Sequence, residues 1–214
     1  MRLGLFGGTF NPIHYGHLRA AEEVAEILQL QRLLFIPAAR PPHKHLEAVT
    51  PFAARLAMTR LAVADHPLFE VSDIENQRPD RSYSIETLRL FRREYGAAAQ
   101  IFFILGLDAM LEIDTWREYR ELFTLCHFFV LDRPGYESQE LEAIMRRKVD
   151  ERCEYLAGDG VFRHPSGNLI YFRPITRLDI SSTHIRSLAG QGLSLRYLLP
   201  EKVRRYILKE KLYR

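Results

Sequence analysis

Short runs of apolar residues recur along the chain and predict the strands of a sheet. They lie at residues 3–6, 33–36, 69–72, 101–105, 128–131 and 169–172, and Pro37 ends the second run. Several runs are continuously apolar instead of alternating with polar residues. That pattern is expected of strands covered by helices on both faces, so it favours a buried parallel sheet.

Segments with helical periodicity lie between these runs. The clearest covers residues 17–30, where five apolar side chains share one face: Leu18, Ala21, Val24, Ala25 and Leu28. Further helices are predicted at 51–64, 85–95 and 138–149 and from about 182 and 200 onward. The predicted N-caps are Thr50, Ser84, Ser138 and Ser181 or Ser182. Pro51 and Pro200 lie at helix starts, and Gly96 can end the helix at 85–95.

This alternation predicts an α/β fold, a Rossmann-like doubly wound parallel sheet with right-handed crossovers. We expect residues 1–214 to form a single domain with a small C-terminal helical part at about 182–214. No repeat or low-complexity linker divides the sequence. Residues 134–165 are the hardest to place, because their glycines and charges could form an excursion from the sheet.

Composition narrows the class of protein. The chain has 214 residues, 47% hydrophobic and 27% charged, with a net charge of +3. The mild charge excess fits an anionic small-molecule ligand and does not indicate nucleic acid. Most of the excess lies in residues 202–214, which we interpret as a solvated amphipathic helix.

Cys126 and Cys153 form no CxxC pair. With no signal-peptide core or membrane span, we expect a cytoplasmic protein that contacts no membrane.

The segment after the first strand, GGTFNPIHYGH (residues 7–17), has the features of a phosphate-binding loop. Ligands of open α/β sheets bind at the carboxyl ends of strands, and the glycines allow close backbone approach. His14 and His17 fall on one face of the following helix start, with Gly16 leaving room between them, and the helix N-terminus adds free N–H groups. The segment matches neither GxxxxGK[ST] nor GxGxxG. Two alternatives are surface histidines and a zinc site, for which no third ligand is evident nearby.

A second candidate segment, DISSTHIR (residues 179–186), follows the last strand. Ser181 or Ser182 can cap the next helix, and Arg186 lies in its first turns. Hydroxyls, a helix N-terminus and an arginine suit a triphosphate. The alternative is an ordinary helix cap with an arginine in solvent. Together, the two segments could hold one triphosphate between two helix N-termini.

These motifs resemble the nucleotidylyltransferase superfamily, in which HxGH and ISSTxxR hold the ATP phosphates. PPHK at 41–44, SYSIETL at 82–88, Gly106-Leu107-Asp108 and Trp116 are similar to the bacterial nicotinate-nucleotide adenylyltransferases of NAD biosynthesis. The resemblance extends from residue 7 to the final helix. Asn11 stands where Asp is frequent, which leaves its role open, and Ser84 and Glu86 stand where Thr and Asp are frequent.

The resemblance implies that ATP and nicotinate mononucleotide are the substrates and that deamido-NAD and pyrophosphate are the products. His14, His17 and Arg186 would be catalytic, and Mg²⁺ would bridge substrate phosphates without dedicated protein ligands. The implied ATP-binding residues are Gly7, Gly8, Thr9, Phe10, His14, His17, Lys44, Gly106, Asp108, Ile180, Ser181, Ser182, Thr183 and Arg186. The implied mononucleotide-binding residues are Gly8, Thr9, Lys44, Tyr83, Ser84, Asp108 and Trp116, with Trp116 stacking on the pyridine ring.

Three other functions are also compatible with the sequence. One is a related transferase with nicotinamide mononucleotide, phosphopantetheine or a glycerol phosphate as acceptor. Another is a non-catalytic nucleotide-binding or nucleic-acid-binding protein; the absence of a basic stripe with interleaved aromatic residues disfavours nucleic acid. A third is a metalloprotein built on His43 and His45. The sequence does not indicate an oligomeric state and is compatible with a homo-oligomer.

Overall fold

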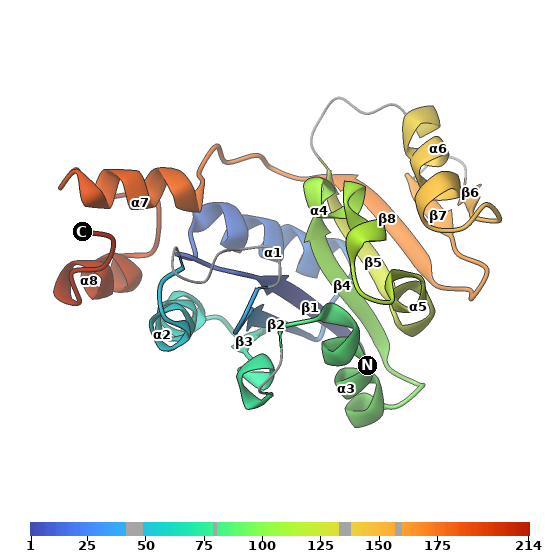
Figure 1. The fold of residues 1–214 in the computed structure, drawn as a ribbon, viewed down its shortest axis with the longest axis horizontal. Helices are drawn as coiled ribbons and strands as arrows, with labels where there is room; N and C mark the ends of the chain where they lie inside the picture. The colour runs from blue at the N-terminus through green and yellow to red at the C-terminus, as the bar shows by residue number, and fades with distance from the viewer. Residues whose placement is uncertain (42–48, 79–80, 133–137, 157–159) are drawn as a thin grey trace.

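The computed structural model describes the chain except for residues 42–48, 79–80, 133–137 and 157–159 (Figure 1). Within the described residues, one eight-stranded sheet has the order β3-β2-β1-β4-β5-β8-β7-β6. The strands are β1 (Arg2–Gly8), β2 (Arg32–Pro37), β3 (Phe69–Val71), β4 (Gln100–Gly106), β5 (His127–Asp132), β6 (Glu154–Leu156), β7 (Val161–Arg163) and β8 (Leu169–Pro174). The predicted α/β fold with a doubly wound parallel sheet is confirmed, with an antiparallel extension formed by β7 and β6.

The order of strands reverses at β1. This strand pairs in parallel with β2 on one side and with β4 on the other. In an open α/β sheet such a switch point leaves a crevice at the carboxyl ends of the strands. Gly7, Gly8 and Gly106 therefore lie at the place where a ligand is expected.

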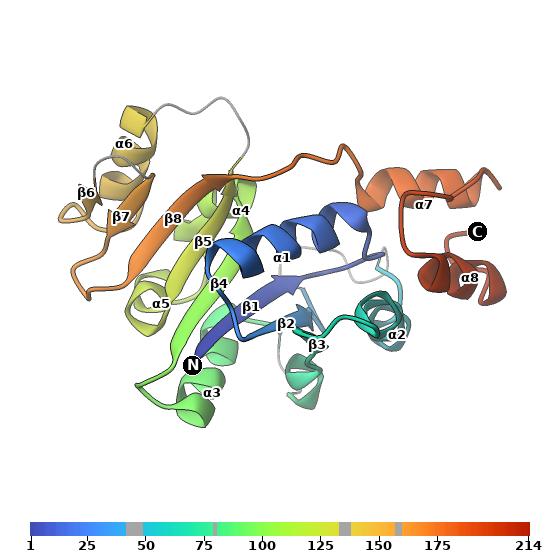
Figure 2. The same cartoon turned by 180° about the vertical axis from the view of Figure 1, so that it is seen from behind.

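Helices cover both faces of the sheet (Figures 1 and 2). The α-helices are α1 (Tyr15–Ile27), α2 (Phe52–Val63), α3 (Ser84–Tyr95), α4 (Leu107–Leu111), α5 (Tyr119–Leu125), α6 (Ser138–Lys148), α7 (Ser182–Gly190) and α8 (Glu201–Lys209), with short 3₁₀ turns η2 (Ile74–Gln77) and η3 (Ile113–Thr115). Side chains from α3, α4, α5 and α6 share one buried cluster with the sheet, and those from α1, α2, α7 and α8 share the other.

The central strand β4 shows why its continuous apolar run is needed. Ile101, Phe103 and Leu105 enter the cluster with α3 to α6, while Phe102 and Ile104 enter the opposite cluster. Fully burying one such side chain stabilises the fold by about 1.5–3 kcal/mol. Because both faces are covered, the five buried positions from Ile101 to Leu105 all gain from being apolar.

Several element ends differ from the predictions. β1 continues through Gly8, which pairs with Pro37, so the two glycines end the strand and do not form a turn. α1 begins at Tyr15, two residues before the predicted start, because the carbonyl of His14 already accepts from the Leu18 N–H. Tyr83 is the N-cap of α3, and Ser84 is its first residue.

Two further predictions about chain segments were wrong in detail. Pro51, not Thr50, is the N-cap of α2. The described part of residues 134–165 contains helix α6 and then β6 and β7, an antiparallel pair that extends the sheet from β8. These three-residue strands are too short to give a clear periodic signal in the sequence.

Among the described residues, no helix has the length and apolar character needed to cross a membrane.

Candidate active site

Two cavities meet at the carboxyl end of β1. The first cavity has a volume of about 440 Å³, and residues from α1, α4 and the loop 175–181 surround it. The second cavity has a volume of about 300 Å³ and lies between the ends of β1, β2 and β4 and the start of α3. Gly7 and Gly8 line both cavities, so the switch point separates two neighbouring binding spaces.

The glycine at position 8 is required by packing. A Cβ at Gly8 would come within 2.9–3.2 Å of three atoms of the Phe10 ring. Such contacts are shorter than real Cβ atoms tolerate, so the ring or the strand end would have to move. Gly8 thus lets Phe10 turn back over β1 beside the first cavity, where both residues are lining residues.

His14 and His17 form a stacked pair in the wall of the first cavity. Their ring centroids are 3.7 Å apart, and the rings are tilted by 31°. The backbone N–H of His14 donates to Nδ1 of His17 at 3.3 Å. This bond assigns Nδ1 of His17 as an acceptor, so in the neutral ring the proton is on Nε2.

His14 is 6% exposed, and burial lowers its pKa to about 4. It is therefore a neutral imidazole near pH 7. Its buried Nδ1 has no hydrogen-bond partner among the residues that the structure describes. A buried polar atom without a partner in a cavity wall is an expected contact point for a ligand.

The structure brings the two sequence motifs together. The hydroxyl of Ser182 donates to the carbonyl of Pro12 at 2.8 Å, and Nη1 of Arg186 donates to the carbonyl of Asn11 at 2.9 Å. Ser181 is the N-cap of α7, as predicted, and its Oγ accepts from the N–H of His184 at 3.1 Å.

Most of the predicted ATP-binding residues line the first cavity. The described residues that line the first cavity include Gly7, Gly8, Phe10, His14, His17, Gly106, Asp108, Ile180 and Ser181. Thr9 lines the second cavity instead. Three predicted residues, Ser182, Thr183 and Arg186, line neither cavity and contact the 9–12 loop or one another. Lys44 lies outside the described residues.

The predicted mononucleotide-binding residues divide in the same way. Gly8, Thr9, Ser84 and Trp116 line the second cavity. The Trp116 ring packs edge-on against Phe103, with centroids 6.3 Å apart and an angle of 86°. Asp108 lines the first cavity. Tyr83 is not in either lining among the described residues, and its ring lies 5.0 Å from the guanidinium carbon of Arg117.

Glu75 and Thr87, two residues that the sequence motifs did not indicate as site residues, both line the second cavity. Glu75 is 7% exposed, and its Oε1 accepts from the Thr87 hydroxyl at 3.0 Å. The same hydroxyl accepts from Nη2 of Arg78 at 2.7 Å. Burial raises the pKa of Glu75, and the hydroxyls of Ser82 and Thr87 and the charge of Arg78 oppose that rise. Thr87 was within the SYSIETL motif, whereas no periodic or motif signal marked Glu75.

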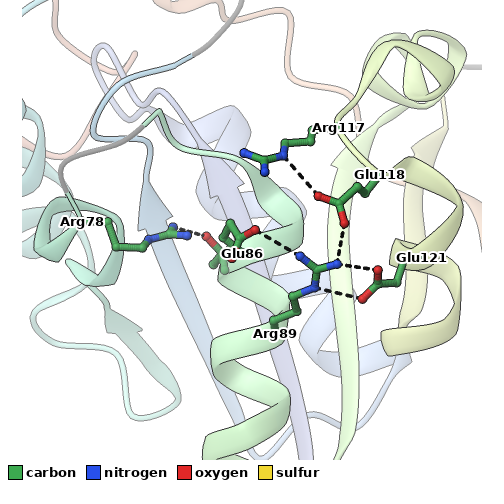
Figure 3. Close-up of polar contacts among 7 residues, drawn as sticks. Arg78, Glu86, Arg89, Arg117, Glu118 and Glu121 are labelled. Atoms are coloured by element: carbon green, nitrogen blue, oxygen red, sulfur yellow. Dashed lines mark hydrogen bonds and ion pairs between the residues drawn. The ribbon is translucent and has the colours of Figure 1, made fainter.

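An arginine-centred network ties the start of α3 to the segment after Trp116 (Figure 3). Arg89 donates to Glu86 on its own helix at 3.1 Å and to Glu121 on α5 at 2.9 Å. It also donates to Glu118, which accepts from Arg117 as well. These side chains are about a third or more exposed, so solvent screens each pair and its contribution to stability is small. The network connects α3, which supplies Ser84 and Thr87 to the second cavity, with the segment that follows Trp116.

Among the described residues, no group of three or more His, Cys, Asp or Glu side chains is arranged to hold a metal ion. Asp108 and Asp179 are the carboxylates in the lining of the first cavity. This lining fits a Mg²⁺ ion that would be held by phosphate oxygens and water, as is usual for this cation.

A Rossmann-like sheet with HxGH at the switch point, and ISSTxxR packed against it, defines a nucleotidylyltransferase. Residues 5–188 match the cytidylyltransferase-like family. Similar proteins include the "probable nicotinate-nucleotide adenylyltransferases" of Geotalea daltonii (46% identity, covering 100% of this chain and 98% of the relative) and Citrifermentans bemidjiense (49%, 100% and 98%).

Solved structures share the fold. A Plasmodium falciparum nicotinic acid mononucleotide adenylyltransferase complexed with NaAD superposes with a TM-score of 0.75 at 18% identity, covering 99% of this chain and 97% of that one. A second complex of that protein, with APC, gives a TM-score of 0.73 at 17% identity over 99% and 96%. The chain belongs to the cytidylyltransferase-like family and, within it, to the nicotinate-nucleotide adenylyltransferases.

Proposed function

We propose that this protein transfers the adenylyl group of ATP to nicotinate mononucleotide, giving deamido-NAD and pyrophosphate. The observation that carries the proposal is the pair of cavities joined at Gly7 and Gly8, one walled by the histidine pair and the other by Trp116. The names of the full-length relatives, and the ligands of the Plasmodium complexes, NaAD and APC, support the choice of substrates.

ATP would occupy the first cavity. A 5′-phosphate oxygen of the mononucleotide attacks the α-phosphorus in line, a new P–O bond forms, the bond to the β-phosphate oxygen breaks, and pyrophosphate leaves. The reactants are anions, so the site must align them and stabilise charge on the transferring group. His14 and His17 would donate N–H groups to the α- and β-phosphates as that charge develops.

The C-terminal motif would hold the leaving group. Ser181 lines the first cavity directly. Ser182, Thr183 and Arg186 follow Ser181 on the first two turns of α7. A helix N-terminus and a guanidinium both favour a phosphate chain. Bound to the phosphates, Mg²⁺ would neutralise part of their charge.

Nicotinate mononucleotide would occupy the second cavity. Trp116 offers a flat apolar surface for the pyridine ring. Ser84, at the start of α3, would contact the nicotinate group together with the N–H groups of that helix end. Asp108, which lies in the first cavity, would bind a ribose hydroxyl near the junction.

The test is pyrophosphate release from ATP and Mg²⁺ with one acceptor at a time. Nicotinate mononucleotide, nicotinamide mononucleotide and phosphopantetheine are offered separately, and His17→Ala serves as a control for contaminating enzymes. We expect fast release with the first acceptor, slow release with the others, and formation of deamido-NAD by chromatography. Release with none of the three acceptors would contradict the proposal.

A further inference from the structure

The loop between β1 and α1 is held by side chains from distant parts of the chain. Loop 9–12 connects the glycines of β1 to His14, and Phe10 lines the first cavity. Nη1 of Arg55 on α2 donates to the carbonyl of Thr9 at 2.7 Å. Ser182 and Arg186 donate to the carbonyls of Pro12 and Asn11. Because a peptide unit is planar, fixing each carbonyl also fixes the rest of that unit.

A fourth contact comes from near the end of the sequence. The hydroxyl of Tyr213 donates to Oδ1 of Asn11 at 3.0 Å, across 202 residues of sequence. Asn11 is 5% exposed, so a lost partner here would leave a buried polar atom. Tyr213 itself has a φ of 68°, a left-handed conformation that is unfavourable for a non-glycine residue and that surrounding contacts must hold.

The surroundings keep Tyr213 as a donor. Burial raises the pKa of Tyr213 to about 12, although a hydrogen bond with the side chain of Thr50 and the nearby charges of Arg186 and Arg55 oppose that rise. The phenol is therefore protonated at neutral pH. Asn11, at the position where the resemblance leads one to expect Asp, provides the acceptor oxygen without burying a charge.

We propose that Tyr213 is a positioning residue for adenylyl transfer: through Asn11 it holds loop 9–12, and with it Arg186, in the arrangement that binds the ATP phosphates. The proposal rests on the function proposed above. Asn11 is the shared partner of Tyr213 and Arg186, which places both on the phosphate side of the loop. The carbonyl of Thr9, which lines the second cavity, accepts from Arg55, whereas Tyr213 donates to Asn11. The effect of Tyr213 should therefore fall on ATP and spare the mononucleotide.

The test compares Tyr213→Phe, Asn11→Ala and the double variant by steady-state kinetics. We expect Tyr213→Phe to lower kcat/KM for ATP roughly three- to tenfold, the effect of one partly buried hydrogen bond, while KM for nicotinate mononucleotide changes less than about twofold. In the Asn11→Ala background the same substitution should have a clearly smaller effect than in wild type, because the bond that the two side chains share is already lost. Tyr197→Phe is the matched control, since Tyr197 is 86% exposed.

Several outcomes would overturn the proposal. They are an unchanged kcat/KM for ATP in Tyr213→Phe, equal losses for both substrates, additive effects in the double variant, or an equal loss in Tyr197→Phe. If Tyr213→Phe does not fold, Asn11→Ala must still show the ATP-specific loss. If wild-type protein releases no pyrophosphate, the proposed function fails, and calorimetric affinities for ATP with Mg²⁺ in wild type and Tyr213→Phe then decide this proposal alone.

Discussion

Burial decides the charge state of His14, and that has a measurable consequence. A histidine whose pKa falls from 6.5 unfolded to about 4 folded binds fewer protons in the native state over that range. Stability is then lost as the pH falls from about 6.5 to 4, by about 3 kcal/mol at most for this group. We expect His14→Gln to reduce that loss, measured by urea unfolding at a series of pH values. His184→Gln, a substitution at an exposed residue, is the control and should keep the wild-type slope.

The contribution of Glu75 to stability should depend on pH in the opposite direction to that of His14. Burial raises its pKa, so the native state binds its proton more tightly than the unfolded chain, and stability is lost as pH rises above about 4.5. We expect Glu75→Gln, which keeps the shape and the Thr87 contact, to gain stability relative to wild type as the pH is raised. Melting temperatures from pH 4 to 8 measure this. A difference that does not vary with pH would contradict the argument.

Residue types with a chemical signature were predictable from sequence, whereas buried charged residues were not. Two histidines three apart after a strand indicated one face of a helix start, and the structure stacks them. Arg55 gave no such signal, because an arginine in a predicted helix is normally at the surface. It is 1% exposed and donates to the carbonyls of Thr9 and Thr50, partners that only the tertiary fold supplies.

At the scale of an element, the first turn of α1 contains a glycine, Gly16, that is unfavourable for the helix but leaves space for the His14 ring. A Cβ on Gly16 would lie 3.0 Å from two ring atoms of His14 and 3.6 Å from the carbonyl of Ile180. Alanine is intrinsically favoured over glycine in a helix by about 1 kcal/mol, but here it must displace the imidazole.

We therefore expect Gly16→Ala to stay folded, with a melting temperature near that of wild type, and to lose at least about tenfold in kcat, as a misplaced catalytic group does. Circular dichroism and pyrophosphate release measure the two properties. Glu26→Ala, at an exposed position of the same helix, is the control for a change in helix propensity. Full activity in Gly16→Ala would show that the His14 ring position is not critical.

Element types followed from the sequence more closely than element ends did. The strands of the parallel sheet have long apolar runs because both faces are buried, and all six predicted strands are present. The ends depend on single hydrogen bonds, such as the one from Leu18 to His14 that begins α1 early. β6 and β7 were not predicted as strands, since their pairing with each other and with β8 depends on the rest of the sheet.

At the scale of the whole molecule, the sequence correctly indicated that its two ends meet. The segments around His14 and Ser182 are far apart in the chain and touch through the Ser182–Pro12 hydrogen bond. The sequence did not indicate that Arg186 would contact Asn11, or that Tyr213 would approach the same residue. Such contacts depend on how α7, α8 and the following residues pack beside α1 and α2, which no local pattern encodes.

The division of the site into two cavities predicts that its substrates can be perturbed separately. Trp116 lines the second cavity and packs against Phe103, while no described residue of the first cavity contacts it through a ring. Loss of a stacking surface for a base-like ring costs about 1–3 kcal/mol. We expect Trp116→Ala to raise KM for nicotinate mononucleotide roughly tenfold or more and to leave KM for ATP within about twofold.

Trp116→Phe separates stacking from packing in this experiment. Phenylalanine retains an aromatic face, so it should recover most of the lost affinity for the mononucleotide. If the role of Trp116 is purely structural, the loss of affinity in each variant should instead follow the fall in its melting temperature. Steady-state kinetics with each substrate varied in turn, alongside thermal unfolding, distinguish the two roles. Equal rises in both KM values, parallel to a lower melting temperature, would show that Trp116 supports the core between β4 and η3. A rise confined to the mononucleotide would assign the second cavity to that substrate and, because Gly7 and Gly8 line both spaces, would place the transferring phosphate at their junction.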